Sequence, residues 1–348
     1  MNTHAPHIAV VILNYNGKKF LSDFLPAVLQ TEYTNYSVWV ADNASTDDSV
    51  SFLQSNYNNT IKLVQLTENH GFAGGYNLAL QQIRADYYVL LNSDVEVTPN
   101  WLAPMVELLE NDTLVAAVQP KIRSYRDRHL LEHAGGAGGY MDALAYPLCR
   151  GRVFSHLETD KGQYDDRAEC FWATGAAMCV RASLFHDLGG LDADFFAHME
   201  EIDWCWRAKR AGYKIMVCPE AVVYHVGGGT LQSNNPHKNY LNFRNSLVSI
   251  TKNETAAKLL WHLPARLVLD GVAGVRFLRE GKWIDVLMIV KAHWYFFFHF
   301  FYILKKRHRE AQLIEKCRVA PPNITTGIID KSIVWSFFVQ NKKMFSEL

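Results

Sequence analysis

The first third of the chain alternates apolar runs with stretches that repeat apolar residues at helical spacing. The run HIAVVILNYN (7–16) is continuously apolar until its polar end, as expected for a strand covered on both faces. Similar strands are expected at 36–45, 61–69 and 86–97, with a helix at about 18–30 after the first. This βαβα order predicts an α/β fold with a doubly wound, mainly parallel sheet.

Ligands of such sheets bind outside the carboxyl ends of the strands, and the polar residues of this chain gather at those ends. They are Asn14 to Asn16, Asp42 to Ser45, Asn69, and Asn92 to Glu96. Ser45 is expected to cap a helix that carries Asp47 and Asp48 in its first turn.

Beyond residue 122 the pattern is less regular. Residues 123–169 are interpreted as an insertion on the acceptor side, and 170–180 (CFWATGAAMCV) as one strand. RASLFHDLGG (181–190) predicts a short helix closed by glycine.

Composition narrows the class of protein. Lysines and arginines number 35, as do aspartates and glutamates, so no overall field attracts nucleic acid. The six cysteines have no zinc-site spacing, and Cys179, Cys205 and Cys218 lie in apolar segments, which predicts buried free thiols in a reducing compartment. The start of the chain lacks a signal-peptide pattern, so a cytoplasmic protein is expected.

The acids that follow the fourth strand are the first candidate site. Asp94 and Glu96 are two residues apart, and alternation would place both on one side of the chain. Oxygen ligands of this kind suit a hard divalent ion, but a solvated turn that caps the next helix is an equal alternative. His225 ends a later strand, where a lone histidine is more often structural than a ligand.

A glycine-rich turn, ENHGFAGGYN (68–77), opens the third helix. Glycine lets the backbone approach a ligand closely, and a helix N-terminus favours anions, although simple turn chemistry explains the same pattern. Asp42 could accept a hydrogen bond from a ribose or a base. NYNGKK follows the first strand where a dinucleotide-binding fold needs its glycine fingerprint, which argues against a dehydrogenase.

The stretch AHMEEIDWCWRAKRAG (197–212) combines three carboxylates with two tryptophans. Helical spacing puts Glu200, Asp203 and Arg207 on one face, and a first turn rich in acids would explain them through the helix dipole. Glu201 shares its face with apolar neighbours, so burial should raise its pKa and make it a better base.

The tail from about residue 254 is rich in aromatic and aliphatic residues. WYFFFHFFY (294–302) leads directly into KKRHR (305–309). Residues 286–304 are long enough to span a bilayer, but Lys291 and two histidines interrupt them. An interfacial helix on an anionic membrane fits this pattern better, and a buried helix or a homodimer contact is the alternative.

Taken together, the motifs resemble the inverting glycosyltransferases of family 2, in particular the rhamnosyltransferase-like branch that builds bacterial cell-surface polysaccharides. The matching segments, in the order of that family, are VVILNYNG, VADNASTDDS, NHGFAGGYN, LLNSDVEV, TGAAMCVRASLF and FFAHMEEIDWCWRAKRAGYKI. The resemblance covers about residues 7–250. It implies the GT-A fold for residues 1–252, followed by a helical, aromatic-rich region at 253–348.

The resemblance also implies roles for single residues. Glu201 would be the catalytic base, and Asp94 with His225 would hold Mg²⁺ or Mn²⁺. The two tryptophans after Glu201 would exclude water or pack against a sugar face. Residues that would bind a nucleotide-sugar donor are Asn14, Tyr15, Asn16, Asp42, Asn69, Gly71, Gly74, Asn77, Asn92 and Ser93. Supporting candidates are Glu96, Glu200, Asp203, Arg207, Gly175 and Trp172.

Two positions depart from the family pattern. Asn92 stands where relatives have the first aspartate of the metal motif, which removes a charge and makes metal binding weaker or dependent on the donor's diphosphate. Glu201 stands where many relatives have aspartate, and its side chain reaches one methylene further.

The implied reaction transfers a sugar from dTDP-rhamnose or a UDP-hexose to a glycan or a lipid-linked acceptor, with inversion. A nucleotidyltransferase and a non-catalytic sugar-nucleotide-binding protein of the same fold are the competing hypotheses. The expected location is the cytoplasm, with peripheral contact to the inner face of the membrane through 284–309.

Overall fold

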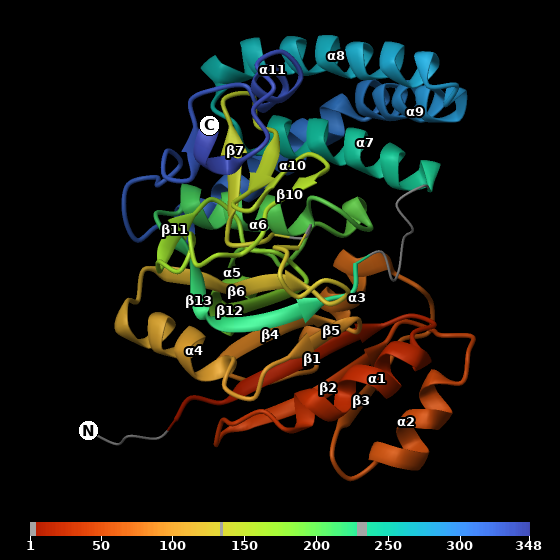
Figure 1. The fold of residues 1–348 in the computed structure, drawn as a ribbon, viewed down its shortest axis with the longest axis vertical. Helices are drawn as coiled ribbons and strands as arrows, with labels where there is room; N and C mark the ends of the chain where they lie inside the picture. The colour runs from red at the N-terminus through yellow and green to blue at the C-terminus, as the bar shows by residue number, and fades with distance from the viewer. Residues whose placement is uncertain (1–4, 133–134, 228–234) are drawn as a thin grey trace.

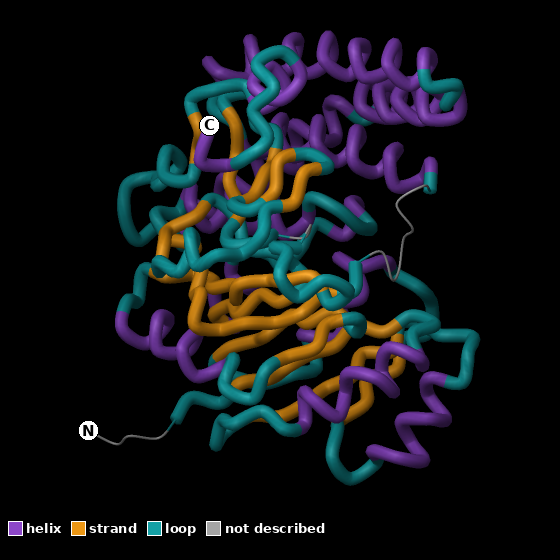
Figure 2. Tube along the Cα trace, in the orientation of Figure 1, coloured by secondary structure: helices purple, strands orange, loops and turns teal. Residues whose placement is uncertain are grey.

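A central mixed sheet with helices on both faces forms the body of the protein (Figure 1; Figure 2). The structure is a computed structural model, and it describes residues 5–132, 135–227 and 235–348. The strands, in their order across the sheet, are β11 (Ala168–Cys170), β13 (Lys214–His225), β6 (Val115–Ser124), β12 (Ala177–Arg181), β4 (Tyr87–Asn92), β1 (Ile8–Asn14), β2 (Tyr36–Asp42) and β3 (Lys62–Gln65), with β5 (Val95–Val97) paired to β13.

The expected α/β sheet is confirmed, and its strand directions are mixed. Strands β3, β2, β1 and β4 run parallel, as do β6 and β13. Strand β12 lies between these two parallel groups and is antiparallel to both β4 and β6. The parallel pattern therefore holds for the first half of the domain and changes where β12 is inserted.

The alternation of side chains along β1 builds the two core layers. Val11 belongs to the cluster that contains residues of α3 and α6, and Val10 belongs to the cluster under α1 and α4. The helices of the domain are α1 (Lys18–Leu29), α2 (Ser49–Tyr57), α3 (Gly71–Leu80), α4 (Leu102–Asn111), α5 (Ala182–Asp187) and α6 (Glu200–Arg210).

The strands are shorter than the sequence pattern predicts, and the difference falls in the loops at their carboxyl ends. The predicted strand at 170–180 is two strands, β11 and β12, because residues 171–176 turn from one to the other. Ser45 does not cap a helix, since α2 begins only at Ser49 after Asp48. Cys179, Cys205 and Cys218 are buried free thiols, as expected.

Residues 123–169 contribute a second, smaller sheet that packs beside the first. Its strands, in order, are β10 (His156–Leu157), β9 (Arg152–Val153), β8 (Pro147–Cys149), β7 (Gly139–Asp142) and β14 (Ile328–Ile329). The last of these comes from the end of the chain and pairs in parallel with β7. The C-terminal residues thus return to the body of the protein.

Long helices cover the α6 side of the molecule (Figure 1). They are α7 (Pro236–Asn253), α8 (Ala256–Arg279), α9 (Trp283–Phe298) and α10 (Phe300–Lys316), followed by the short α11 (Ile333–Phe338). The boundary expected between residues 252 and 253 falls in the last turn of α7, and this division into domains stays a prediction. Within the described part of the chain, no single helix is both long and apolar enough to cross a membrane, whereas α9 and α10 together pass by length and composition but bend by 66°.

Candidate active site

Polar side chains at the ends of β1 and β2 form one side of the candidate site. Asn14 and Asp42 are register partners, and the Asn14 amide donates to the Asp42 carboxylate (3.0 Å) and to the Ser45 hydroxyl (3.1 Å). The Asn16 side-chain oxygen accepts from the backbone N–H of Thr46 at 2.7 Å. The buried Oδ1 of Asn14 has no hydrogen-bond partner among the described residues. The two loops are therefore joined by a buried polar network in which one acceptor is unpaired.

The end of β4 lies beside this polar network. The backbone N–H of Asn92 donates to the Ala176 carbonyl (3.0 Å), which ties β4 to the turn before β12. A Cβ at Gly17 would lie 2.4 Å from Oδ1 of Asn14 and 3.4 Å from Oγ of Ser93, so both side chains approach the turn after β1. The Tyr15 side chain is exposed next to them.

Asn43 organises the glycine-rich turn, and the sequence reasoning missed it. Its amide donates to Oδ1 of Asn69 (3.0 Å) and to the carbonyl of Gly71 (2.9 Å), while its oxygen accepts from the backbone of His70 (3.0 Å). Gly71 has φ +69°, and a Cβ there would lie 2.5 Å from Phe196, so only glycine fits. The position of Asn43 directly after Asp42 was the one available signal.

Two other residues of the predicted donor loop have structural contacts. Both amide atoms of Asn77 bond the backbone of Leu191, at 2.7 and 2.9 Å. A Cβ at Gly74 would lie 2.9 Å from Cβ of His70, so glycine permits close packing there. These contacts hold α3 against the loop before α6, and a role in binding the donor stays a prediction.

Asp94 and His225 meet at the other side of the site. Nε2 of His225 lies 3.2 Å from Oδ1 of Asp94, and Nδ1 lies 2.9 Å from Oε2 of Glu132. Burial by itself would lower the pKa of His225, but the hydrogen bonds to Asp94 and Glu132 outweigh it and raise the pKa to about 10. The sequence reasoning missed Glu132, which lies 93 residues from His225.

This pair fits a divalent cation that displaces the proton on Nε2 of His225, because an imidazole binds a metal through an unprotonated nitrogen. Glu132 occupies Nδ1 of the imidazole, so Nε2 is the nitrogen that faces Asp94, and an oxygen and a nitrogen ligand converge. Among the described residues there is no cluster of three or more His, Cys, Asp or Glu side chains that could hold a metal ion. An ion at Asp94 and His225 would take its remaining ligands from outside this pair.

Glu96 does not join Asp94, which corrects the expectation that both would face one side. Asp94 lies in the turn after β4, where strand alternation does not apply, and Glu96 lies on β5. The carboxylate of Glu96 accepts from Nη2 of Arg128 through both oxygens, at 2.9 Å each. The two acids therefore serve different partners.

Glu201 is partly buried at the start of α6. Burial raises its pKa, which the backbone N–H groups of Glu201 and Gly175 partly offset. A Cβ at Gly175 would lie 2.9 Å from the ring of Phe72 and 3.9 Å from Cβ of Glu201, so glycine allows this close approach. Oε2 of Glu201 has no hydrogen-bond partner among the described residues. The expected desolvated carboxylate is present.

The neighbouring acids differ from Glu201. Glu200 is buried, and burial together with the nearby charge of Glu201 raises its pKa well above the ordinary value. Asp203 is fully buried and bonds Nε of Arg207 at 3.1 Å, so it is a core ion pair rather than a solvated residue of a first turn. Arg207 also donates to the carbonyls of Leu188 and Gly190.

The tryptophans belong to the core, which corrects part of the expectation. Trp204 is 0% exposed and stacks near Phe185, while Trp206 is 3% exposed and meets Phe171 edge-on. Neither can stack on a sugar, although both keep water from the helix that carries Glu201. Trp172 is also buried, and its indole N–H donates to the backbone of Tyr140 (2.8 Å).

A strained loop leads into α6. Phe196, His198 and Met199 have φ values of 64°, 69° and 74°, a region that costs a non-glycine residue about 1–3 kcal/mol. Asn245 of α7 holds this loop, because its amide donates to the carbonyls of residues 195, 197 and 198. Arg244 donates to the carbonyls of residues 194 and 195. Helix α7 thus fixes the backbone immediately before the candidate base.

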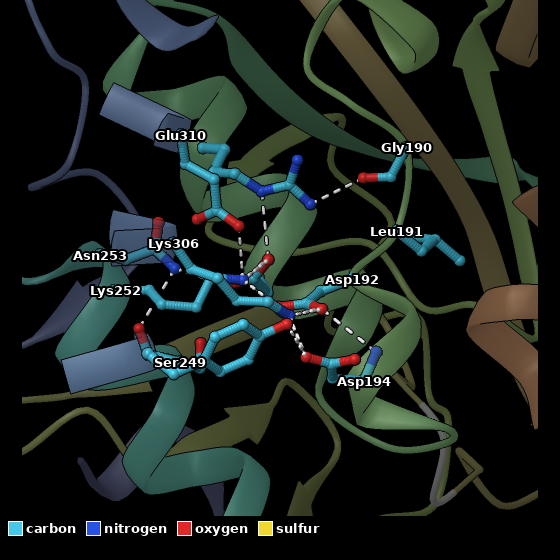
Figure 3. A network of polar contacts seen from close by, with 12 residues as sticks. Gly190, Leu191, Asp192, Asp194, Ser249, Lys252, Asn253, Lys306 and Glu310 are labelled. Atoms are coloured by element: carbon cyan, nitrogen blue, oxygen red, sulfur yellow. Dashed lines mark hydrogen bonds and ion pairs between the residues drawn. The ribbon is translucent and has the colours of Figure 1, made fainter. Parts of the chain in front are cut away.

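A buried ion network joins α6 to the C-terminal helices (Figure 3). Nζ of Lys252 lies 3.1 Å from Asp203, 2.6 Å from Asp192 and 2.7 Å from Glu310. Burial works against the charge of Lys252, but these carboxylates outweigh it and raise its pKa. Lys306 of α10 also pairs with Asp192. The network therefore ties the loop before Glu201 and α6 itself to α7 and α10.

We expect Lys252→Met to destabilise the fold strongly. Removing the lysine leaves the carboxylates of Asp203, Asp192 and Glu310 buried with less compensation, which typically costs about 3–5 kcal/mol. Urea unfolding measures the change. Lys258→Met, at an exposed lysine in the first turn of α8, is the control, and an equal effect of the two substitutions would contradict the prediction.

Comparison with known proteins decides the family. The family model for glycosyl transferase family 2 matches residues 9–189, just over half of the 348-residue chain. The chain belongs to glycosyltransferase family 2. The protein is a glycosyltransferase of the hexosyltransferase type, and the expected family is confirmed.

Relatives of this family 2 glycosyltransferase include an N-acetylglucosaminyl-diphospho-decaprenol L-rhamnosyltransferase of Mycobacterium tuberculosis. The two are 24% identical over 237 residues, which is 63% of this chain and 75% of the relative. An uncharacterized protein, y4gI, of Sinorhizobium fredii is 26% identical over 63% of this chain, and the match spans only 24% of that protein.

The solved structures confirm the GT-A fold. The mannosyltransferase PcManGT of Pyrobaculum calidifontis, in complex with GDP-Man and Mn²⁺, has a TM-score of 0.53 and 18% identity to this family 2 glycosyltransferase. The match covers 84% of this chain and 87% of that one. At this identity the likeness concerns the fold alone.

Proposed function

We propose that the protein transfers a sugar from a nucleotide-diphosphate donor, dTDP-rhamnose or a UDP-hexose, to a hydroxyl of a glycan or lipid-linked acceptor with inversion. The family assignment favours this reaction over the nucleotidyltransferase and the non-catalytic binding protein that the sequence left open. The M. tuberculosis relative, named as a rhamnosyltransferase acting on a diphospho-decaprenol substrate, supports the donor and acceptor classes.

One observation carries the proposal: the turn at 173–176 adjoins both Glu201 and the end of β4, the strand that leads to Asp94. A Cβ at Gly175 would lie 3.9 Å from Cβ of Glu201, and the carbonyl of the next residue, Ala176, accepts from the backbone N–H of Asn92 at 3.0 Å. Asn92 lies two residues before Asp94, which faces His225. The candidate base and the strand that leads to the candidate cation site therefore meet at one turn, which suits a displacement between an acceptor and a diphosphate.

The chain's own residues account for the proton and the positioning. Glu201 takes the proton of the acceptor hydroxyl while the oxygen of that hydroxyl forms the bond to the anomeric carbon. The bond from that carbon to the diphosphate breaks on the opposite face, and the nucleoside diphosphate leaves with the electron pair. A single displacement of this kind inverts the anomeric centre. Asn14 and Asp42 would hold the nucleoside.

Asp94 and His225 would hold Mg²⁺ or Mn²⁺, and the bound ion would supply charge stabilisation for the departing diphosphate. Glu132 keeps the imidazole in one orientation through its hydrogen bond to Nδ1 (2.9 Å). Because Asn92 has no carboxylate, the cation site would depend on oxygens of the donor's diphosphate as well.

Product analysis tests the proposal. The full chain is incubated with a panel of dTDP- and UDP-sugars, Mn²⁺ and a lipid-diphosphate acceptor, and the release of nucleoside diphosphate is measured. We expect release with one donor class and a product of inverted anomeric configuration by NMR. A retained configuration, or turnover of none of these donors, would contradict the proposal.

The pH profile gives a separate prediction. Burial raises the pKa of Glu201, and a base must be ionised to work, so the rate should fall as the pH drops through that raised pKa. The acid limb of kcat, at saturating donor and metal, should therefore lie above the ordinary glutamate pKa of about 4.3. In Glu201→Gln the residual rate should lack this limb, and an unchanged limb in that variant would assign the titration to another group.

A further inference from the structure

Helix α9 exposes a continuous apolar stripe. Its members recur every third or fourth position and are 46–61% exposed: Trp283, Leu287, Val290, Trp294 and Phe297. The opposite side of α9, formed by Ile289, Ala292 and Phe296, is buried in the protein. An isolated exposed apolar residue needs no explanation, but an aligned set of this size indicates an interaction surface.

Helix α8 exposes a second stripe of the same kind. Trp261 is 79% exposed, and Val268, Val272 and Val275 follow on the same side with 50–67% exposure. Its opposite side contains the buried residues Arg266 and Asp270, and Asp270 bonds His293 of α9 (3.0 Å). The two helices pack together at the end of the molecule opposite α2 and β3 (Figure 1). We call the two stripes together the α8–α9 face.

The charge of this region is one-sided. Residues 255–309 contain ten lysines and arginines but three carboxylates, whereas the whole chain has 35 of each sign. Basic side chains that are exposed along the two helices and the start of α10 are Lys258, Arg276, Arg279, Lys282, Lys291, Lys305 and Arg309. Glu280 pairs with two of them, Arg276 and Lys282. The apolar stripes are therefore bordered by net positive charge.

We propose that the α8–α9 face docks onto the surface of an anionic lipid bilayer. Exposed tryptophans suit the interface between headgroups and acyl chains, and the basic border suits anionic headgroups. A second copy of the chain would bring the same positive border against itself, which disfavours a self-association through this face. The sequence pattern placed the contact within 284–309, and the structure adds α8 to it.

The α8–α9 face is structurally connected to the candidate base. Helix α7 contacts α8 and α9 on one side and α6 on the other, and Asn239 of α7 donates to Asp285 of α9 at 2.9 Å. The same helix holds the loop before Glu201 through Asn245. An acceptor carried on a lipid would therefore enter from the membrane surface that α8 and α9 contact. This link between docking and catalysis rests on the proposed function.

Vesicle flotation of the full chain tests the docking without any sugar chemistry. We expect the protein to float with vesicles containing phosphatidylglycerol, less with pure phosphatidylcholine, and less at high salt. Trp283→Ser with Trp294→Ser should weaken binding at least about tenfold for each tryptophan removed. Trp294→Phe, which keeps the side chain apolar, should retain most of the binding.

The charge border has its own pair of variants. Arg279→Gln and Lys305→Gln should each weaken binding to the anionic vesicles about fivefold. Lys62→Gln, at an exposed lysine on β3 at the other end of the molecule, is the control and should change nothing.

Two outcomes would overturn the docking proposal. One is a full chain that floats with neither kind of vesicle. The other is a solution dimer that the double serine variant disperses, which would assign the face to a second copy. Release of nucleoside diphosphate with a soluble acceptor is measured in parallel, so that loss of docking and failure of the proposed transfer are distinguished.

Discussion

Glu201→Gln is expected to lower kcat about 10²- to 10⁴-fold while leaving the dissociation constant of the donor nearly unchanged. Glutamine keeps the size and the hydrogen bonding of the side chain but cannot accept the acceptor proton, and loss of a positioned general base has this cost. Asn14 and Asp42, where we propose that the nucleoside binds, form hydrogen bonds that do not involve the Glu201 carboxylate. Steady-state rates and calorimetric binding of the donor measure the two quantities.

The neighbouring acids are matched controls on the same helix. Asp203→Asn removes a buried partner of Lys252 and Arg207, so we expect lower stability with a smaller change in kcat per folded molecule. Glu200→Gln removes a buried carboxylate whose pKa is already raised, so we expect little change in rate. Loss of kcat in Glu200→Gln with a normal rate in Glu201→Gln would move the base by one residue.

Asp94→Asn is expected to abolish transfer and to weaken binding of Mn²⁺ by more than about 10- to 100-fold. Loss of a residue that only supports a metal ligand typically has that smaller effect, whereas Asp94 would contact the ion directly. Asp94 is only 4% exposed, so asparagine is used because it preserves the volume of a buried side chain. Binding is measured by the EPR signal of free Mn²⁺ in the presence of a nucleoside diphosphate. EDTA should remove the activity of the unchanged protein, and full activity in the chelator would contradict the metal assignment.

Two further carboxylates give the graded comparison. Glu132→Gln should weaken Mn²⁺ binding about 10- to 100-fold, because it removes the charge that orients the imidazole of His225. Glu96→Gln should have no effect, since that carboxylate pairs with Arg128 instead of the cation site. An equal loss of Mn²⁺ binding in Glu96→Gln and Glu132→Gln would contradict the assignment of Glu96 to Arg128 instead of the cation site.

The sequence by itself determined the sheet and the main candidates of the site. A strand buried on both faces must be apolar along its whole length, so β1, β2 and β4 were recognisable without any contact information. Polar residues at their carboxyl ends, such as Asn14, Asp42 and Asp94, follow from the same rule, because parallel strands open their loops at one edge. Glu201 was recognisable because a carboxylate on an apolar helical face is unusual.

Predictions from the local sequence pattern were wrong where a turn interrupts a strand. The alternation of side chains along a strand predicted that Glu96 lies beside Asp94. The turn at 93–94 ends the strand, and Glu96 pairs with Arg128 instead. The apolar run 170–180 read as one strand because a buried turn is as apolar as the strands that flank it. The sequence left open whether the tryptophans of α6 exclude water or pack against a sugar, and their burial shows only once the neighbouring elements are in place.

Tertiary structure alone decided the partners of the charged groups. Glu132 reaches His225 across 93 residues, and Lys252 reaches Asp203 across 49. No local repeat carries such pairings, because a charge on an isolated helix or strand is equally consistent with solvent. Burial makes the pairing necessary, because an unpaired charge in the core has a far higher free energy than one in water. Burial is a property of the packed chain and not of any single segment.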